Sequence, residues 1–389
     1  MKIGIILPST PGYSETFFRN KIKGLEKNGH SVTLFVNSKS FLESNFKNVV
    51  VAPNLSGSSF FLVIKSFYIL FKSFIFYSKK VKKLYNLNKK DQFSFQKNLQ
   101  NIVINNHFLS QKLDWLHFGF GTMALDRENV AKAIGAKMAV SFRGFDWYVY
   151  PTKNKKCYDL LFSKPIKYHV LSDGMKIDLM KFGINSKKII KITPAIDLNL
   201  FSNIGEFELK QQLQIVTIAR LHWIKGIEYT LQALALVKQS GIDFQYTIIG
   251  DGIEKERLEF AAYQLGLTEN VTFTGKLNPE ELKIRLQKSN LYLQYSLQEG
   301  FCNAVLEAQA MGLLCVVSDA DGLQENIVHE ITGFVVPKRN SELLAKKIIE
   351  TTQLSIEKRN QFIKNAIARV KRDFNVANQI EEFVDFYKN

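Results

Sequence analysis

The stretch from Glu299 to Glu307 places two carboxylates on either side of a predicted helix start. It follows an apolar strand candidate, 291–295, and enters a helical pattern over 303–311. Backbone N–H groups of Gly300, Phe301, Cys302 and Asn303 would point out of that helix start, where the helix dipole favours an anion. Carboxylates accept hydrogen bonds from vicinal hydroxyls, so the pair suits a sugar and a ribose. The residues alone leave an alternative open, in which Glu299 only interacts favourably with the helix dipole and Glu307 is a solvated helix residue.

Two cations, Arg220 and Lys225, occupy the loop after another strand candidate, 214–219. They could hold a diphosphate, Arg through its planar fork and Lys as a point charge, although solvated loop cations are also common. A third loop, Gly250-Asp251-Gly252, follows the strand candidate 245–249. Its glycines allow the backbone to approach a ligand closely, or equally to form a tight turn with a helix-capping aspartate.

Alternating strands and helices must position these loops. In the second half the predicted strands are 214–219, 245–249, 271–274, 291–295, 314–317 and 333–336, and the predicted helices between them are 226–239, 254–265, 280–288, 303–311 and 341–350. In the first half the predicted strands are 2–7, 31–36, 138–142, 167–171 and 189–192, with a helix over 14–28 that Ser14 would cap. This alternation predicts parallel sheets, whose ligands bind at the carboxyl ends of the strands. Two more helices are expected within 356–388.

Composition limits the class of protein. The 389 residues are 46% hydrophobic, which excludes disorder over most of the chain, and the length favours two or three domains. Three cysteines, Cys157, Cys302 and Cys315, cannot form a disulfide framework, and no pair has metal-site spacing. The apolar run after Met1 and Lys2 is too short for a signal peptide.

The positive charge lies in the first half. Residues 1–200 hold 31 Lys and Arg against 12 Asp and Glu, a net charge of +19, whereas residues 201–389 hold 21 against 24, a net charge of −3. Such asymmetry indicates that one half faces an acidic partner, which could be nucleic acid, anionic lipid or a phosphorylated substrate. Solvated surface lysines are the alternative.

Residues 60–77 form an unusually apolar segment, in which 14 of 18 residues are apolar. Its polar pairs recur every seven residues and so share one stripe of a helix: Ser58-Ser59, Lys65-Ser66, Lys72-Ser73 and Lys79-Lys80. Central lysines disfavour a spanning helix, and a helix lying in the membrane surface fits better. The expected contacts are Lys65, Phe67, Lys72, Phe74, Lys79 and Lys80. An ordinary core helix with one wet stripe is the alternative.

These motifs together resemble glycosyltransferase family 4, the retaining, nucleotide-sugar-dependent enzymes of GT-B fold. Glu299 to Glu307 is similar to the family's Glu-x7-Glu pattern, supported by Arg220, Lys225-Gly226, Gly250-Asp251-Gly252 and Gly333 to Val336. The residues Ser14 to Phe17 after Pro11, and His117-Phe118-Gly119, are similar to the branch that builds bacterial surface polysaccharides. Ser172 and Pro194 to Asp197 are similar to the end of the family's N-terminal domain.

The resemblance implies an α/β GT-B architecture, with two Rossmann-like doubly wound domains facing across a cleft. The expected acceptor domain is 1–200, with the C-terminal helix 372–389 packed back on it, and the donor domain is 201–371. Arg220 and Lys225 would bind the donor diphosphate, Glu299 the transferred sugar, and Glu307 the ribose hydroxyls. Gly12 and Tyr13 would border the diphosphate from the first domain.

The acceptor side departs from the family pattern, since Arg143 replaces the usual histidine before Gly144 and the first loop has one glycine rather than two. The acceptor-side candidates are Glu15, His117, Arg143 and Asp146. The resemblance implies a UDP-, GDP- or ADP-sugar donor, a glycan acceptor, no metal or cofactor, and a role in capsule, exopolysaccharide or lipopolysaccharide synthesis. The net charge of +19 on residues 1–200 favours a lipid-linked acceptor, and the segment 60–77 favours a location on the inner face of the cell membrane.

Three other functions compete with this one. An oxidoreductase would need a Gly-x-Gly-x-x-Gly turn, and neither 7–12 nor 219–226 supplies one. A nucleic-acid-binding protein is disfavoured by the apolar segment 60–77. A catalytically inactive sugar-nucleotide binder or a membrane-associated interaction protein stays open as the alternative.

Overall fold

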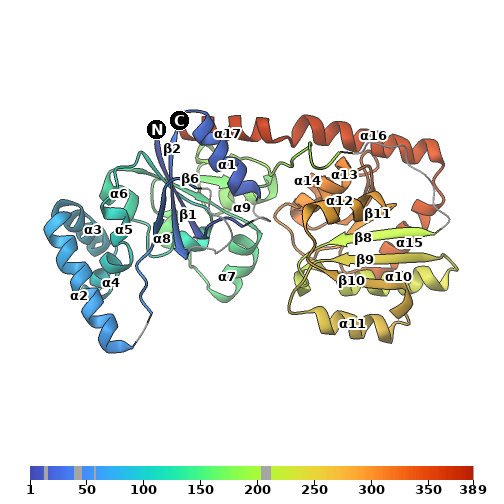
Figure 1. The fold of residues 1–389 in the computed structure, drawn as a ribbon, viewed down its shortest axis with the longest axis horizontal. Coiled ribbons are helices and arrows are strands. Elements are labelled where there is room, and N and C mark those ends of the chain that lie inside the picture. Colours follow the sequence, from blue (N-terminus) through green and yellow to red (C-terminus); the bar gives the residue numbers. More distant parts are fainter. Residues whose placement is uncertain (13–15, 39–45, 57, 203–211, 389) are drawn as a thin grey trace. The chain divides into compact units, whose positions relative to one another are not determined.

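The structure is a computed structural model that describes residues 1–389 except 13–15, 39–45, 57, 203–211 and 389. The chain forms two compact units (Figure 1). Unit 1 comprises Met1–Ile192 with Ile380–Asn389, and unit 2 comprises Thr193–Gln379. The assignment of acceptor and donor binding to separate domains stays a prediction.

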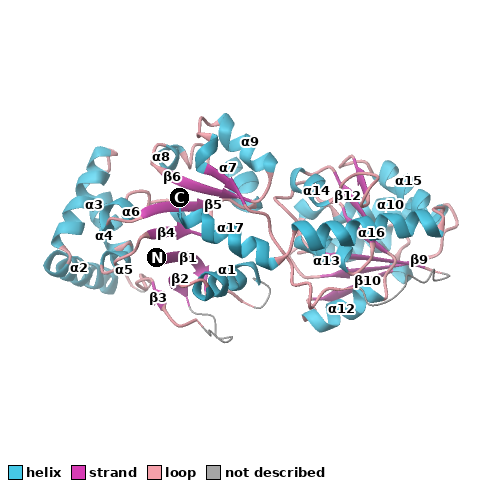
Figure 2. Ribbon diagram, turned by 90° about the horizontal axis from the view of Figure 1, so that it is seen from above, coloured by secondary structure: helices cyan, strands magenta, loops and turns pink. Residues whose placement is uncertain are grey.

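Unit 1 contains a seven-stranded parallel sheet in the order β3-β2-β1-β4-β5-β6-β7 (Figure 2). Its strands are β1 Lys2–Ser9, β2 Ser31–Ser38, β3 Val49–Val51, β4 Trp115–Phe118, β5 Lys137–Ser141, β6 Ile166–Val170 and β7 Ile189–Lys191. The central strands are buried on both faces and therefore read as continuous apolar runs such as Ile3 to Leu7.

The helices of unit 1 follow the strands along the chain. They are α1 Thr16–Lys27, α2 Ser59–Phe76, α3 Ser78–Lys90, α4 Phe95–Ile104, α5 Asn106–Leu109, α6 Val130–Ile134, α7 Tyr150–Lys153, α8 Asp159–Phe162 and α9 Asp173–Lys181. Short helical turns lie at Gly121–Ala124, Phe145–Val149 and Ser186–Lys188. The end of the C-terminal helix, α17 Val376–Lys388, adds Phe383, Phe386 and Tyr387 to the core around β1 and α1.

Unit 2 contains a six-stranded parallel sheet in the order β10-β9-β8-β11-β12-β13. Its strands are β8 Leu213–Ile218, β9 Phe244–Ile249, β10 Val271–Gly275, β11 Leu291–Gln294, β12 Leu314–Ser318 and β13 Phe334–Val336. Its helices are α10 Ile227–Gln239, α11 Lys255–Gln264, α12 Pro279–Gln287, α13 Asn303–Ala310, α14 Asp321–Asn326, α15 Ser341–Thr352 and α16 Ile356–Asp373, with turns at Trp223–Lys225 and Thr268–Asn270. The strand order reverses between β8 and β11, and the loops after these two strands carry the expected donor residues.

The expected pair of parallel-sheet α/β domains is confirmed. Every strand predicted in the second half is present, within a residue or so of the expected limits. The strands that were not predicted are β3 and β4, and the helix that was not predicted in the second half is α14. Each of these elements has at most six residues, too few to show a clear period.

Helix α2 is the expected apolar helix, but the core alternative is wrong. Phe60, Phe61 and Phe67 are each at least 70% exposed. Among the described residues no single helix is long and apolar enough to cross a bilayer, and α2 with α3 meets that test only as a pair bent by 113°.

Candidate functional site

The ion pair between Lys225 and Glu299 forms the centre of the candidate site. The Lys225 Nζ donates to Glu299 Oε2, and the two side chains are only 18% and 12% exposed. Lys225 ends the turn after β8, and Glu299 lies in the loop between β11 and α13. The parallel sheet thus brings together two residues that are 74 positions apart in sequence.

Electrostatics keep Lys225 charged. Burial would lower the pKa of Lys225, but the charge and the hydrogen bond of Glu299 outweigh burial and raise it. The exposed Arg220, next to the same strand end, acts in the opposite direction as a neighbouring positive charge. Two cations and one carboxylate therefore share this edge of the sheet.

Gly226 fixes the loop that carries Lys225. Its φ is +61°, and a Cβ there would lie 2.1 Å from the carbonyl oxygen of Tyr295. The Leu297 N–H donates to Ile224 O at 2.8 Å, which ties the same loop to the residues leading to Glu299. Only glycine permits this contact, so Gly226 sets the separation between Lys225 and Glu299.

The Gly250-Asp251-Gly252 loop supports Arg220 by backbone packing. A Cβ at Gly250 would lie 1.9 Å from Ala219 O, and one at Gly252 would lie 2.2 Å from Leu221 O. The Leu221 N–H donates to Asp251 O at 2.9 Å. These contacts explain both glycines without a ligand. The expected donor role of Gly250, Asp251 and Gly252 stays a prediction.

A buried polar chain leads to Glu299 along β11. The Tyr292 hydroxyl donates to Gln294 Oε1 at 2.8 Å, and Gln294 Nε2 donates to Ser296 Oγ at 2.9 Å. Ser296 Oγ in turn donates to Glu299 Oε2 at 3.2 Å. Neither Gln294 nor Ser296 was predicted from the sequence. Their signal is the alternation in 291–296, where every second residue is polar or carries a hydroxyl although the whole strand is buried.

Asn326 clamps the loop between Glu299 and α13. Its side chain accepts from the Cys302 N–H and donates to the Cys302 carbonyl, both at 3.0 Å. One of the N–H groups expected to bind the donor, that of Cys302, therefore has a protein partner. The Gly322 N–H of α14 donates to Glu299 O at 2.9 Å and ties the same loop to α14.

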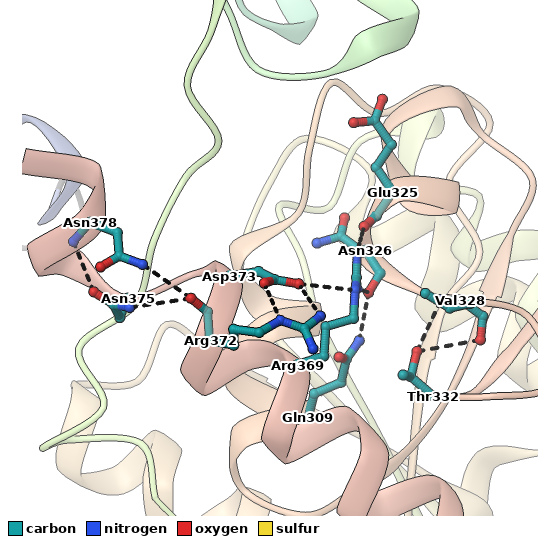
Figure 3. A network of polar contacts seen from close by, with 10 residues as sticks. All are labelled: Gln309, Glu325, Asn326, Val328, Thr332, Arg369, Arg372, Asp373, Asn375 and Asn378. Atoms are coloured by element: carbon teal, nitrogen blue, oxygen red, sulfur yellow. Dashed lines mark hydrogen bonds and ion pairs between the residues drawn. The ribbon is translucent and has the colours of Figure 1, made fainter. Parts of the chain in front are cut away.

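Helix α16 supports Asn326 through Arg369, as Figure 3 shows. Arg369 Nη1 and Nη2 donate to the carbonyls of Asn326 and Glu325, each at 2.6 Å. Gln309 Nε2 also donates to Asn326 O at 3.0 Å. The chain from Arg369 through Asn326 to Cys302 positions the Glu299 loop. None of its three members was assigned this role in the sequence analysis.

Glu307 lies one turn inside α13 and keeps part of its side chain exposed. Burial of the carboxyl raises its pKa to about 7. The charges of Glu299 and Glu307 both contribute to the raised pKa of Cys302, which is mainly due to burial, so the two carboxylates surround one loop. Gly300, Phe301 and Asn303 belong to the same connection into α13. Their expected contact with a donor stays a prediction.

The candidate site residues in unit 1, which are the acceptor-side candidates and the two residues expected beside the diphosphate, divide into two groups. Arg143 follows β5 and is partly exposed, with its guanidinium 4.3 Å and 4.5 Å from the ring centres of Phe17 and Phe18. Gly12 lies in the loop after β1. Tyr13 and Glu15 lie outside the described residues.

His117 and Asp146 are corrections, because both side chains are buried. His117 lies in β4 and is hydrogen-bonded to Lys21 of α1, Ser141 of β5 and Tyr387 of α17. Burial and the positive charge of Lys21 lower its pKa well below the usual range. Asp146 Oδ1 accepts from the Thr122 hydroxyl at 2.9 Å. Both side chains hold unit 1 together and are not exposed to an acceptor.

The expected membrane contacts also divide. Lys65, Phe67, Lys72, Phe74 and Lys79 are exposed. Lys80 is a correction, because its Nζ donates to the carbonyls of Leu109 and Gln111, each at 2.7 Å, and so ties α3 to the domain.

Comparison with known proteins adds family information for unit 2. Residues 203–369 match the family model described as glycosyl transferases group 1. The amylovoran biosynthesis glycosyltransferase AmsK of Erwinia amylovora is 29% identical over 247 residues, 61% of this chain and 60% of that protein. The UDP-Gal:alpha-D-GlcNAc-diphosphoundecaprenol alpha-1,3-galactosyltransferase of Escherichia coli is 26% identical over 241 residues, 59% of this chain and 56% of that protein. The matches span less than two thirds of the length of these relatives.

The similarity of fold covers the whole chain. The structure of Anabaena HepE in complex with UDP and glucose is similar, with a TM-score of 0.74, 16% sequence identity, and coverage of 100% of this chain and 99% of that one. The expected GT-B class, two Rossmann-like parallel-sheet domains, is confirmed.

Proposed function

We propose that this protein is a retaining, metal-independent glycosyltransferase of bacterial surface polysaccharide synthesis. It would move a sugar from a nucleotide-sugar to a hydroxyl of a lipid-linked glycan. The observation that carries the proposal is the Lys225–Glu299 ion pair beside Arg220, at the point where the strand order of unit 2 reverses. That edge is where open α/β sheets bind nucleotides.

The reaction requires that a diphosphate leave the anomeric carbon of the sugar. Arg220 and Lys225 would stabilise the negative charge that develops on it. Glu299 would contact the sugar hydroxyls, and Glu307 the ribose hydroxyls, both as hydrogen-bond acceptors. The acceptor hydroxyl would attack on the face from which the diphosphate leaves and pass its proton to a leaving-group oxygen. The anomeric configuration would be retained.

The substrate classes follow from the relatives and from charge. The relatives act in amylovoran synthesis and on a diphosphoundecaprenol-linked sugar, and a fold neighbour binds UDP and glucose. The net charge of +19 on residues 1–200 suits an acceptor that carries a lipid diphosphate. Within unit 1, the partly exposed Arg143 would contact that acceptor. The proposed location is the inner face of the cell membrane.

A screen of nucleotide-sugars tests the proposal. The purified protein is heated with UDP-, GDP- and ADP-sugars, and the melting temperature is recorded for each. The proposal predicts stabilisation by one nucleotide class, followed by release of that nucleoside diphosphate when a lipid-linked glycan is added. Stabilisation without turnover over a broad acceptor set would favour the inactive sugar-nucleotide binder. No stabilisation by any donor would reject both.

A further inference from the structure

Helix α2 turns its apolar side chains away from the protein. Ten of them are between 49% and 72% exposed: Phe60, Phe61, Val63, Ile64, Phe67, Tyr68, Phe71, Phe74, Ile75 and Phe76. At about 100° per residue, nine of the ten fall within an arc of roughly 160°. Contiguous apolar surfaces of this kind on soluble domains mark a site of contact with a partner or a membrane.

The inner face of α2 is the more polar one. Ser73 is fully buried, and its hydroxyl donates to Ile69 O at 2.6 Å and accepts from Asn106 of α5. Ser66 is half-buried on the same stripe, beside the buried Ile69. The core-helix alternative would turn the polar stripe toward water, but the serines of this stripe face the domain. The apolar arc of α2, formed by the exposed apolar side chains named above, is therefore not explained by packing against the rest of this chain.

Charge restricts what can cover this arc. The segment from Ser59 to Lys90, which forms α2 and α3, contains eight lysines and no aspartate or glutamate. On α3 a shallow hollow of about 370 Å³ is lined by Lys79, Lys82, Lys83, Asn86, Leu87 and Lys90. A second copy of this chain would bring lysines against lysines, whereas phosphate headgroups would neutralise them.

The packing of α3 against the domain leaves α2 as the helix that can lie on the membrane surface. Val81 and Leu84 of α3 are fully buried, and Asn88 donates to Asn98 and Asn101 of α4. The turn of 113° at Tyr77 leaves α2 as one separate apolar segment with α3 anchored in the domain. A helix of this kind can sink its apolar arc among the acyl chains while its inner face stays on the protein.

We infer that α2 docks unit 1 on an anionic lipid bilayer, with Phe67 and Phe71 near the centre of the buried arc and the α3 lysines on the phosphate headgroups. The inference deepens the membrane location within the proposed function. Its test uses binding alone, so its failure and the failure of sugar transfer can be told apart.

The test is sedimentation of the full chain with vesicles of phosphatidylcholine alone and with added phosphatidylglycerol. The F67S/F71S variant replaces two exposed aromatic side chains. Its affinity for anionic vesicles is expected to fall by at least about tenfold. The matched control, F260S/Y263S, removes two similarly exposed aromatics from α11 in unit 2 and should bind like the original protein. Circular dichroism and melting confirm that both variants are folded.

Four results decide the inference. Preference for the anionic vesicles, and loss of binding in F67S/F71S but not in the control, support it. Equal binding to both kinds of vesicle would overturn the role of the lysines. Unchanged binding by folded F67S/F71S would overturn the role of α2. A dimer in solution that F67S/F71S dissociates without affecting vesicle binding would assign the arc to a second copy.

Discussion

Lys225 and Glu299 form a largely buried ion pair that joins the loops after β8 and β11, the two strands at which the order of the unit 2 sheet reverses. Each residue depends on the other: Glu299 raises the pKa of Lys225, and Lys225 compensates a carboxylate that is only 12% exposed. The pair holds the Lys225 ammonium in a fixed position where a donor diphosphate is expected.

Replacing Lys225 with methionine should lower sugar transfer at least about a thousandfold, because the charge on the leaving diphosphate loses one of its two assigned cations. The variant also leaves Glu299 without its partner, which should reduce the free energy of unfolding by about 3 kcal/mol. Transfer assays and denaturant unfolding measure the two effects separately.

The double variant K225M/E299Q is the control for this loss of stability. Since it removes both charges, it should recover most of the unfolding free energy but none of the activity. Near-normal transfer by either variant would contradict the assigned role of Lys225.

Ser296 is expected to position Glu299. The S296A variant loses the hydroxyl that links Gln294 to Glu299, and kcat should fall about tenfold with a stability loss of about 1 kcal/mol. The affinity for the nucleoside diphosphate alone should be unchanged, since Glu299 is assigned to the sugar. S240A removes a hydroxyl that bonds only within its own turn and should leave kcat unchanged. Equal loss of nucleoside diphosphate affinity in S296A would argue for a general structural defect.

The raised pKa of Glu307 should make donor binding depend on pH. Its raised pKa of about 7 means that the carboxyl takes up a proton as the pH falls through 7 and loses acceptor capacity for ribose hydroxyls. Binding of a nucleoside diphosphate should therefore weaken, by up to about tenfold, between pH 8 and pH 6. The E307Q variant should bind more weakly with a flatter profile, and an identical profile in both proteins would remove Glu307 from the site.

Asn326 should matter for stability and for activity together. The N326A variant leaves the N–H and the carbonyl of Cys302 without their partner in a buried loop, which should cost about 2 kcal/mol of unfolding free energy. Because this loop carries Glu299, transfer should fall as well. Q361A, on the exposed side of α16, is the control. Full activity in N326A would show that the clamp does not position Glu299.

Metal removal should leave the reaction intact, because Arg220 and Lys225 are assigned the charge stabilisation that a divalent ion supplies in other transferases. Transfer measured after EDTA treatment, with and without added magnesium, tests this. A loss of activity that magnesium restores would contradict the metal-independent part of the proposal.

Unit 2 was the more predictable half. Its strands are apolar runs separated by clear helical periods, so the loops holding Arg220, Lys225 and Glu299 could be placed on one sheet edge from sequence. The supports of that edge were not predicted. Asn326 ends the six-residue helix α14, and Arg369 lies in α16, 43 positions further along the chain. No local sequence pattern indicates that these two residues contact each other or the Glu299 loop.

Unit 1 shows two limits of sequence reasoning. Histidine is often a catalytic or binding residue, which made His117 a candidate. Its burial follows from contacts with Lys21 and Tyr387, which are distant in sequence and could not be predicted from its position in a strand. The period-seven stripe of α2 could be recognised, but its direction could not. Whether serines or phenylalanines face inward depends on the partners offered by α5, such as Asn106.

Calorimetric titration of UDP, GDP and ADP into the original protein and into K225M tests donor binding by these loops most directly. One of the three nucleotides should bind in the micromolar range, and K225M should weaken this binding by at least about tenfold. No binding by any of the three, or equal binding by K225M, would contradict the claim that these loops hold a nucleoside diphosphate.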